Sequence, residues 1–204
     1  STLITGDTNS MTDTFLHNRT ANTTVRISKL GATEANGDSM YPYLVSAQNS
    51  GLVFVTFVSR ASNLASPDYS DNDYAFIYSL STDTLTRLTE CGPASEPSSI
   101  SYSVSASDDG ALVAFASYAS NLVSGDTNRA TDVFLYDRNS AQISLISRAP
   151  DDSAASDHSV YPLISAEGNH VVFTSMASNL VDGDINDNQD VFVYDRNTGL
   201  TSCV

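Results

Sequence analysis

A seven-residue motif of acidic and amide side chains, Asp-x-Asn-x-x-x-Asp, occurs three times in the chain. Each occurrence places two carboxylates and an amide oxygen in one short loop, and oxygen donors of this kind are the ligands that calcium prefers. No Cys or His accompanies them, which argues against zinc or copper. The motif therefore predicts calcium (Ca²⁺) sites at Asp7, Asn9 and Asp13, at Asp126, Asn128 and Asp132, and at Asp184, Asn186 and Asp190.

The third occurrence loosely resembles the calcium loop of an EF-hand, because Asp182 and Asn188 add further oxygen donors. However, Asp187 stands where an EF-hand needs glycine, and Val193 stands where it needs a bidentate glutamate. The loop is therefore not predicted to be an EF-hand.

A second interpretation needs no ion. Asp and Asn are common in turns because their side chains accept hydrogen bonds from the backbone two residues later. A duplicated loop would repeat that pattern whether or not it binds calcium. A fourth, degenerate loop keeps Asp68 but has Ser70 and Tyr74 in the other two places, which favours an optional ion over a fixed structural need.

These loops belong to an internal repeat. Residues 119–138 align without gaps on residues 177–196 with fourteen of twenty positions identical, and residues 1–19 match residues 120–138 at eleven of nineteen. Residues 61–80 form the degenerate copy. Agreement at this level indicates internal duplication, and we treat the chain as a single domain of four repeats. The repeats span residues 1–40 (partial), 41–100, 101–160 and 161–204.

Each repeat is predicted to form four short strands. A turn such as residues 107–110 ends the first strand, a compact apolar strand follows, and the Asp-rich loop leads into an aromatic, β-branched third strand. A tight turn such as residues 195–199 then leads into the fourth strand. The predicted second strands are 52–57, 112–115 and 171–173, the third strands 132–136 and 190–194, and the fourth strands 24–27, 84–88, 142–146 and 200–204.

Four antiparallel strands repeated at a fixed period predict an all-β fold of β-propeller blades. The Ser-x-Asp-Gly turn, the Val-x-Phe-x-Ser strand and the strand ending in Tyr-Asp-Arg-x-Thr-Gly resemble the blades of TolB-like β-propellers, over nearly the whole chain. Propellers of that family serve as protein-binding modules, as domains beside hydrolases and as secreted proteins, so the resemblance implies a fold and not one activity.

The repeats amount to three complete blades plus a half blade, whereas a closed propeller has at least four. An open set of blades exposes strand edges. We therefore expect the ring to be closed by the rest of a longer chain or by another chain.

Composition limits the classes of partner. The chain has 24 acidic and nine basic residues, and its net charge of −15 repels phosphate backbones, which argues against nucleic-acid binding. No apolar run approaches the roughly 20 residues of a membrane span. An acidic, lysine-poor surface suits a secreted, cell-surface or periplasmic protein.

Catalysis is not predicted within these residues. No Gly-x-Ser-x-Gly elbow positions a nucleophile, and His17 takes the place of strand tyrosines, where we expect it to be half-buried. Cys91 has no basic neighbour that would activate it, and whether it pairs with Cys203 stays open. The recurring Ala-Ser-Asn-Leu segment is predicted to use its asparagine, as in Asn63 and Asn179, to bond loop backbone.

Three hypotheses for function follow. The first is a secreted or periplasmic propeller module that binds a protein or glycan, with calcium stiffening its loops. The second is an accessory propeller beside a hydrolase domain, and the third is a purely structural repeat without metal.

Overall fold

The structure is a computed structural model, which describes residues 3–46, 51–66, 72–88, 101–186 and 188–204. The described residues contain sixteen strands and no helix. The strands are β1 (Phe15–Asn18), β2 (Thr23–Arg26), β3 (Lys29–Leu30), β4 (Thr33–Glu34), β5 (Ser39–Ser46), β6 (Val53–Ser59), β7 (Tyr74–Ser79), β8 (Thr84–Arg87), β9 (Ser101–Ala106), β10 (Leu112–Ser117), β11 (Asp132–Asp137), β12 (Gln142–Leu145), β13 (Ser159–Ile164), β14 (His170–Ser175), β15 (Asp190–Asp195) and β16 (Leu200–Cys203).

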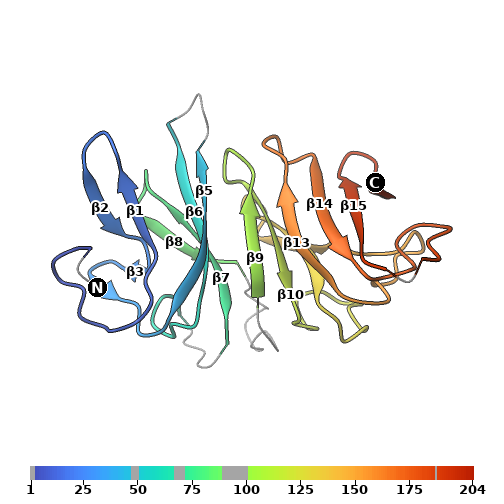
Figure 1. Ribbon diagram of the computed structural model, residues 1–204, viewed down its shortest axis with the longest axis horizontal. Helices are drawn as coiled ribbons and strands as arrows, with labels where there is room; N and C mark the ends of the chain where they lie inside the picture. The colour runs from blue at the N-terminus through green and yellow to red at the C-terminus, as the bar shows by residue number, and fades with distance from the viewer. Residues whose placement is uncertain (1–2, 47–50, 67–71, 89–100, 187) are drawn as a thin grey trace.

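Three sheets of four antiparallel strands follow one another along the chain, in the orders β5-β6-β7-β8, β9-β10-β11-β12 and β13-β14-β15-β16. Sequential pairing of this kind is the arrangement of a propeller blade. The hairpin β1-β2 supplies the third and fourth strands of a half blade, and β3-β4 is a short extra hairpin. The sheets stand side by side in a row, with the two ends of the described chain at opposite ends of the row (Figure 1).

The prediction of an all-β fold with three four-stranded blades and a half blade is confirmed. The strand boundaries agree to within one or two residues for most strands, because the turns that end them are marked in the sequence. The β3-β4 hairpin, which pairs only two residues on each side, was not predicted.

A pair of phenylalanines marks the centre of each complete blade. Phe115 of β10 lies opposite Phe134 of β11, and their rings stack with centroids 5.6 Å apart. The equivalent pairs Phe57–Phe76 and Phe173–Phe192 stack at 5.5 Å and 5.8 Å. Stacked aromatic pairs across neighbouring strands stabilise the sheet beyond their buried area.

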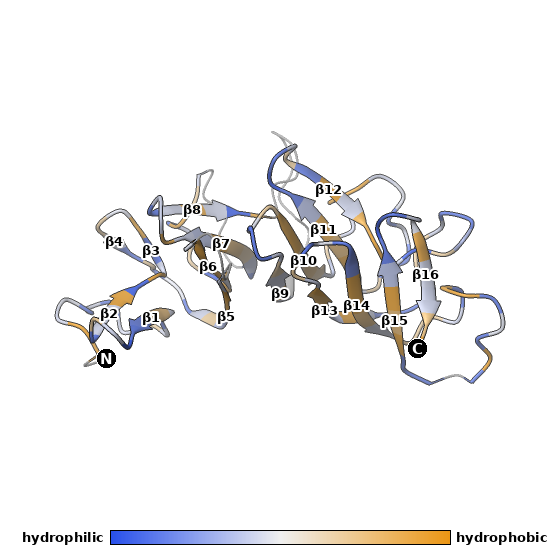
Figure 2. Cartoon of the chain, turned by 90° about the horizontal axis from the view of Figure 1, so that it is seen from above, coloured by the Kyte–Doolittle hydropathy of each residue, from blue (hydrophilic) through white to orange (hydrophobic). Residues whose placement is uncertain are grey.

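The hydrophobic core lies between neighbouring sheets. Three clusters of buried side chains fill the three gaps, one between the half blade and the first complete blade and two between successive complete blades. In Figure 2, strands such as β10 and β13 are coloured as hydrophobic over much of their length. Each sheet therefore buries its faces mainly against its neighbours, as propeller blades do.

The turn at Gly110 and the equivalent turn at Gly168 each join their blade to the one before it. Gly110 has a φ of +66°, and a Cβ at this position would lie 2.7 Å from the Phe54 ring of the preceding blade. Arg138 holds the same turn, because its guanidinium donates to the Gly110 carbonyl at 2.9 Å and stacks over the Phe54 ring. Gly168, Leu112 and Arg196 repeat this contact one blade later.

Candidate cation sites in the Asp-rich loops

The asparagine of each Asp-x-Asn-x-x-x-Asp motif holds its loop in one conformation. Asn128 donates its amide to the Asp132 carboxylate at 2.7 Å and to the Ala155 carbonyl at 2.8 Å, and its Oδ1 accepts the Ala130 N–H at 2.9 Å. Asn9 and Asn186 also donate to the last aspartate of their own motifs and accept the N–H two residues later. In all three loops, the asparagine thus forms the predicted hydrogen bond with the backbone two residues later.

A serine from the segment after the fourth strand holds the last aspartate in the first and third repeats. Ser147 donates its hydroxyl to Asp132 Oδ1 at 2.6 Å and accepts the Val133 N–H at 3.0 Å. Ser28 makes the same two bonds, to Asp13 at 2.5 Å and from Thr14 at 3.1 Å. These serines were not among the predicted site residues, although Ile-Ser follows the fourth strand in both repeats.

In the first repeat, an arginine lies between the two carboxylates. Arg26 places NH2 3.1 Å from Asp7 Oδ1 and Nε 3.5 Å from Asp13 Oδ2. The side chains of Arg26, Asp7 and Asp13 are only 5%, 2% and 1% exposed, so the guanidinium neutralises buried charge. Glu34 pairs with the far side of the same guanidinium at 2.9 Å, and Arg26 holds the pKa of Glu34 below its usual value.

The third repeat keeps the two carboxylates without the arginine. Asp132 is fully buried, Asp126 is 6% exposed, and no cationic side chain of the described residues forms an ion pair with either. Asp126 Oδ1 is buried and has no hydrogen-bond partner among the described residues. Burial raises the pKa of Asp132 to about 6, with a smaller contribution from the Asp126 charge, and burial also raises the pKa of Asp126.

In the fourth repeat, the same residues line an open cavity. Asp184, Asn186, Asp190 and the exposed, free Cys203 are among the residues that line this space of about 260 Å³. Asn186 is exposed, and both aspartates are partly exposed. Water can therefore solvate these carboxylates, which makes an ion less necessary here than in the third repeat.

The degenerate second repeat has lost the acidic pair. Asp68, Ser70 and Cys91 lie outside the described residues. Tyr74 occupies the place of the last aspartate, and the Arg87 guanidinium lies 5.3 Å from the centre of its ring. In this repeat, the arginine therefore makes a cation–π contact with the tyrosine that takes the place of the last aspartate.

Within the part of the chain that the structure describes, no group of three or more His, Cys, Asp or Glu side chains forms a metal cluster. A cation in the third repeat would have carboxylate oxygens from Asp126 and Asp132 and would need backbone carbonyls or water for its remaining ligands. The donor set fits a hard cation because it contains only oxygen.

The remaining polar residues have structural roles. Asn179 donates to the Ala154 carbonyl at 3.1 Å and accepts the Ser156 N–H at 2.7 Å, and Asn63 makes equivalent backbone bonds, as predicted. His158 accepts the Thr131 N–H at 2.8 Å. His17 lies in β1 as predicted, but it is exposed rather than half-buried, because the half blade leaves that position open to solvent.

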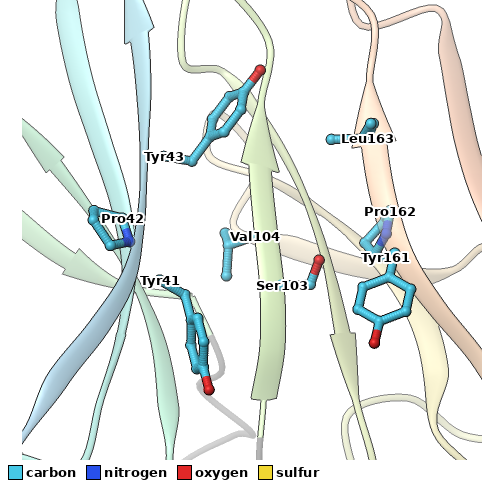
Figure 3. Close-up of a pocket in the computed structure, with 8 residues that line it drawn as sticks. All are labelled: Tyr41, Pro42, Tyr43, Ser103, Val104, Tyr161, Pro162 and Leu163. Carbon is cyan, nitrogen blue, oxygen red and sulfur yellow. The ribbon is translucent and has the colours of Figure 1, made fainter.

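A groove of about 440 Å³ runs across the first strands of the three complete blades (Figure 3). Tyr41 and Tyr161, which are 65% and 68% exposed, lie on either side of the strand that carries Ser103. These three residues have positive φ values of 54°, 56° and 46° and lie at the β-bulges of β5, β13 and β9. The other lining residues carry no charge and are Pro42, Tyr43, Val104, Pro162 and Leu163. The bulges direct exposed tyrosines toward one uncharged surface, which we call the inner-strand groove.

The blades and the repeated loops together define the class of the molecule, a β-propeller-type chain with three complete blades and a half blade. No family model and no curated protein matches its sequence. No helix of the described residues has the length and apolar character that a membrane span requires.

Solved structures with a similar course of the chain include several larger proteins. An oligogalacturonate lyase from Vibrio parahaemolyticus is 11% identical with a TM-score of 0.47, and the match covers 89% of this chain and 41% of that one. The Dos1 propeller is 10% identical with a TM-score of 0.44 and coverages of 91% and 40%, and the tricorn protease is 12% identical with a TM-score of 0.41 and coverages of 94% and 20%. The chain spans less than half of each of these structures.

Proposed function

We propose that this chain is a protein-binding part of a β-propeller and that a calcium ion bound between Asp126 and Asp132 stabilises it. The observation that carries the calcium site is the buried Oδ1 of Asp126, which has no hydrogen-bond partner among the described residues, beside the fully buried Asp132. Two buried carboxylates without a counter-charge are unfavourable in water-excluded surroundings, and a bound cation removes that cost.

Calcium suits this place better than other cations. The donors are oxygens on an irregular loop, and calcium accepts irregular oxygen geometry, whereas magnesium requires a near-ideal octahedron and retains its water. Two carboxylates are few for a calcium site, so the affinity should fall in the range of extracellular modules, whose Kd values are about 10⁻⁴–10⁻³ M. Such a site is filled only where calcium is abundant, which supports a secreted, cell-surface or periplasmic setting.

Thermal unfolding with calcium or with chelator tests the site. At a hundredfold excess over Kd, one site stabilises the folded chain by about 2.7 kcal/mol. The Asp126→Asn variant should lose this response, whereas Asp184→Asn in the more solvated fourth repeat should retain most of it. Identical unfolding curves of the unmutated protein in calcium and in chelator would show that no calcium ion binds these two carboxylates.

The inner-strand groove is the surface we propose for the partner. Tyrosine is enriched in protein interfaces because its ring contributes contact area and its hydroxyl contributes a hydrogen bond. Aromatic grooves with proline accept extended peptide segments, and the lining here is uncharged. Because the chain as a whole carries −15, we expect the partner to be a neutral or basic peptide segment rather than an acidic one.

Selection from a random peptide library tests whether the groove binds peptides, and a glycan array tests whether it binds glycans instead. Peptides selected on the unmutated chain should lose at least about fivefold in affinity for Tyr161→Ala, since removal of a tyrosine that is a hot spot costs more than about 1 kcal/mol. Leu200→Ala, an exposed apolar change on the outer strand β16, is the matched control and should bind normally. Selected peptides that bind both variants equally, or glycans as the sole ligands, would overturn the assignment.

We also propose that the chain belongs to the TolB-like propellers. This proposal rests only on the repeated turn and strand motifs of the sequence. The proposals of calcium binding and peptide binding do not depend on it.

A further inference from the structure

One position of the fourth strand differs among the repeats in a way that bears on the acidic loops. Strand pairing places this residue opposite the central phenylalanine of the third strand in every repeat. The pairs are Phe15–Arg26, Phe76–Arg87, Phe134–Leu145 and Phe192–Cys203. The four residues are therefore structurally equivalent, although only two of them carry a charge.

Arg26 and Glu34 are both present in the first repeat and both replaced in the third, whereas the acidic pair is present in both repeats. Where Arg26 is present, Glu34 pairs with its far side. In the third repeat, Leu145 replaces the arginine. The carbonyl groups of Ala35 and Ala155 accept the same hydrogen bond from the motif asparagines, so these two alanines are equivalent. The residue before each of them is Glu34 in the first repeat and Ala154 in the third. The third repeat thus lacks the whole arginine-centred ion cluster but retains the two carboxylates.

The hydrogen bonds that hold the motif asparagine and the last aspartate are the same in the two repeats. The motif asparagine, the serine after the fourth strand and the acceptor carbonyl make matching hydrogen bonds. The place of the Arg26 guanidinium in the first repeat therefore corresponds to the space beside Asp126 and Asp132 in the third. In the first repeat, that place already contains a positive charge within 3.5 Å of both carboxylates.

We infer that Arg26 is a built-in substitute for the cation, so that the fourth-strand residue decides whether an Asp-rich loop is neutralised by the chain itself or binds a metal ion. The first repeat then binds no calcium, and the third repeat binds it because Leu145 leaves the carboxylates without a counter-charge. The third-repeat half of this inference rests on the proposed calcium site, whereas the first-repeat half stands on the observed ion pairs. Asp7, Asn9 and Asp13 become a cation site only when Arg26 is removed.

A reciprocal exchange tests the inference. Leu145→Arg should abolish the calcium response of the third repeat and raise the melting temperature in chelator, because the new guanidinium can pair with Asp126 and Asp132. Arg26→Leu should lower the melting temperature in chelator and gain a calcium-dependent rise of roughly 5–10 °C at a hundredfold excess over Kd. Arg26→Lys retains the charge and should gain no such response. Gln142→Arg, an exposed site on the same strand as Leu145, controls for the added charge.

The outcomes separate this inference from the proposed function. If the unmutated chain ignores calcium but Arg26→Leu responds to it, the third-repeat site fails while the role of Arg26 stands. If the unmutated chain responds and Arg26→Leu adds nothing, or if Arg26→Leu and Arg26→Lys gain the same response, Arg26 is not a substitute for the ion. If Arg26→Leu does not fold, Leu145→Arg decides alone, and an unchanged calcium response in that variant overturns the inference.

Discussion

Replacement of Asp132 by asparagine should remove a defined part of the pH dependence of stability in calcium-free buffer. Asp132 is fully buried, and burial is the main reason why its pKa rises from the ordinary 3.8 to about 6. The folded state therefore favours the protonated form of this side chain over its ionised form.

The direction and size of the effect follow from the two pKa values. Because the folded-state pKa lies above the unfolded-state value, the contribution of Asp132 to stability is fully present below the unfolded-state pKa and is lost as the pH rises through about 6. For one group whose pKa is shifted from 3.8 to about 6, the free energy of unfolding should be about 1.4 kcal/mol higher at about pH 5 than at about pH 7.5. In a chain of this length, that difference corresponds to about 3–6 °C in Tm.

Thermal unfolding followed by circular dichroism, in chelator at both pH values, measures the effect. The change in Tm between the two pH values is compared between the unmutated chain and Asp132→Asn. Carboxylates whose pKa is lowered, such as Asp109, lose their contribution only at lower pH and do so in both proteins. Calcium at the higher pH should restore the stability of the unmutated chain, since the ion binds the ionised carboxylate. Equal pH dependence in the two proteins would refute the reasoning, because Asp132 would then have an ordinary pKa.

Two further changes test the fold around the site. Gly110→Ala should destabilise the chain by about 2–5 kcal/mol in urea unfolding, since it adds a clash with Phe54 to the strain of a positive φ. Gly199→Ala, with φ +72° and open space around its Cβ, should cost only about 1–2 kcal/mol. Equal losses of stability in the two variants would contradict the contact between blades. Ser147→Ala removes a hydroxyl that donates a hydrogen bond to Asp132, and it should lower the free energy of unfolding by about 1–3 kcal/mol near neutral pH and by less near pH 5. A loss of stability that does not depend on pH would contradict the link to the carboxylate.

The repeat made most of the fold predictable. Once residues 119–138 and 177–196 are aligned, the strands, turns and blade order follow from local signals such as the apolar run of β10 and the turn at Gly199. The bulges at Tyr41 and Tyr161 were not predictable, because a positive φ at tyrosine opposes local preference and depends on packing between blades.

The acidic loops were found from sequence, but what neutralises them was not. Arg26 lies thirteen residues after Asp13, on the far strand of a hairpin, and the motif that drew attention to the loop does not include it. A comparison of the fourth strands opposite Phe15 and Phe134 would have shown arginine in one and leucine in the other. The burial of Asp132, which separates the third repeat from the solvated fourth, depends on tertiary packing.

The contact of Gly110 and Arg138 with Phe54 makes this turn depend on the blade before it, and the Gly168 turn repeats the dependence one blade further. A row of units linked only to their neighbours behaves as a one-dimensional chain, in which opening starts at the ends and moves inward. The two-stranded β1-β2 unit has a blade on one side only among the described strands, so its amide hydrogens should exchange with solvent fastest. Amides of β10 and β11, which have a blade on each side, should exchange only when several units open together.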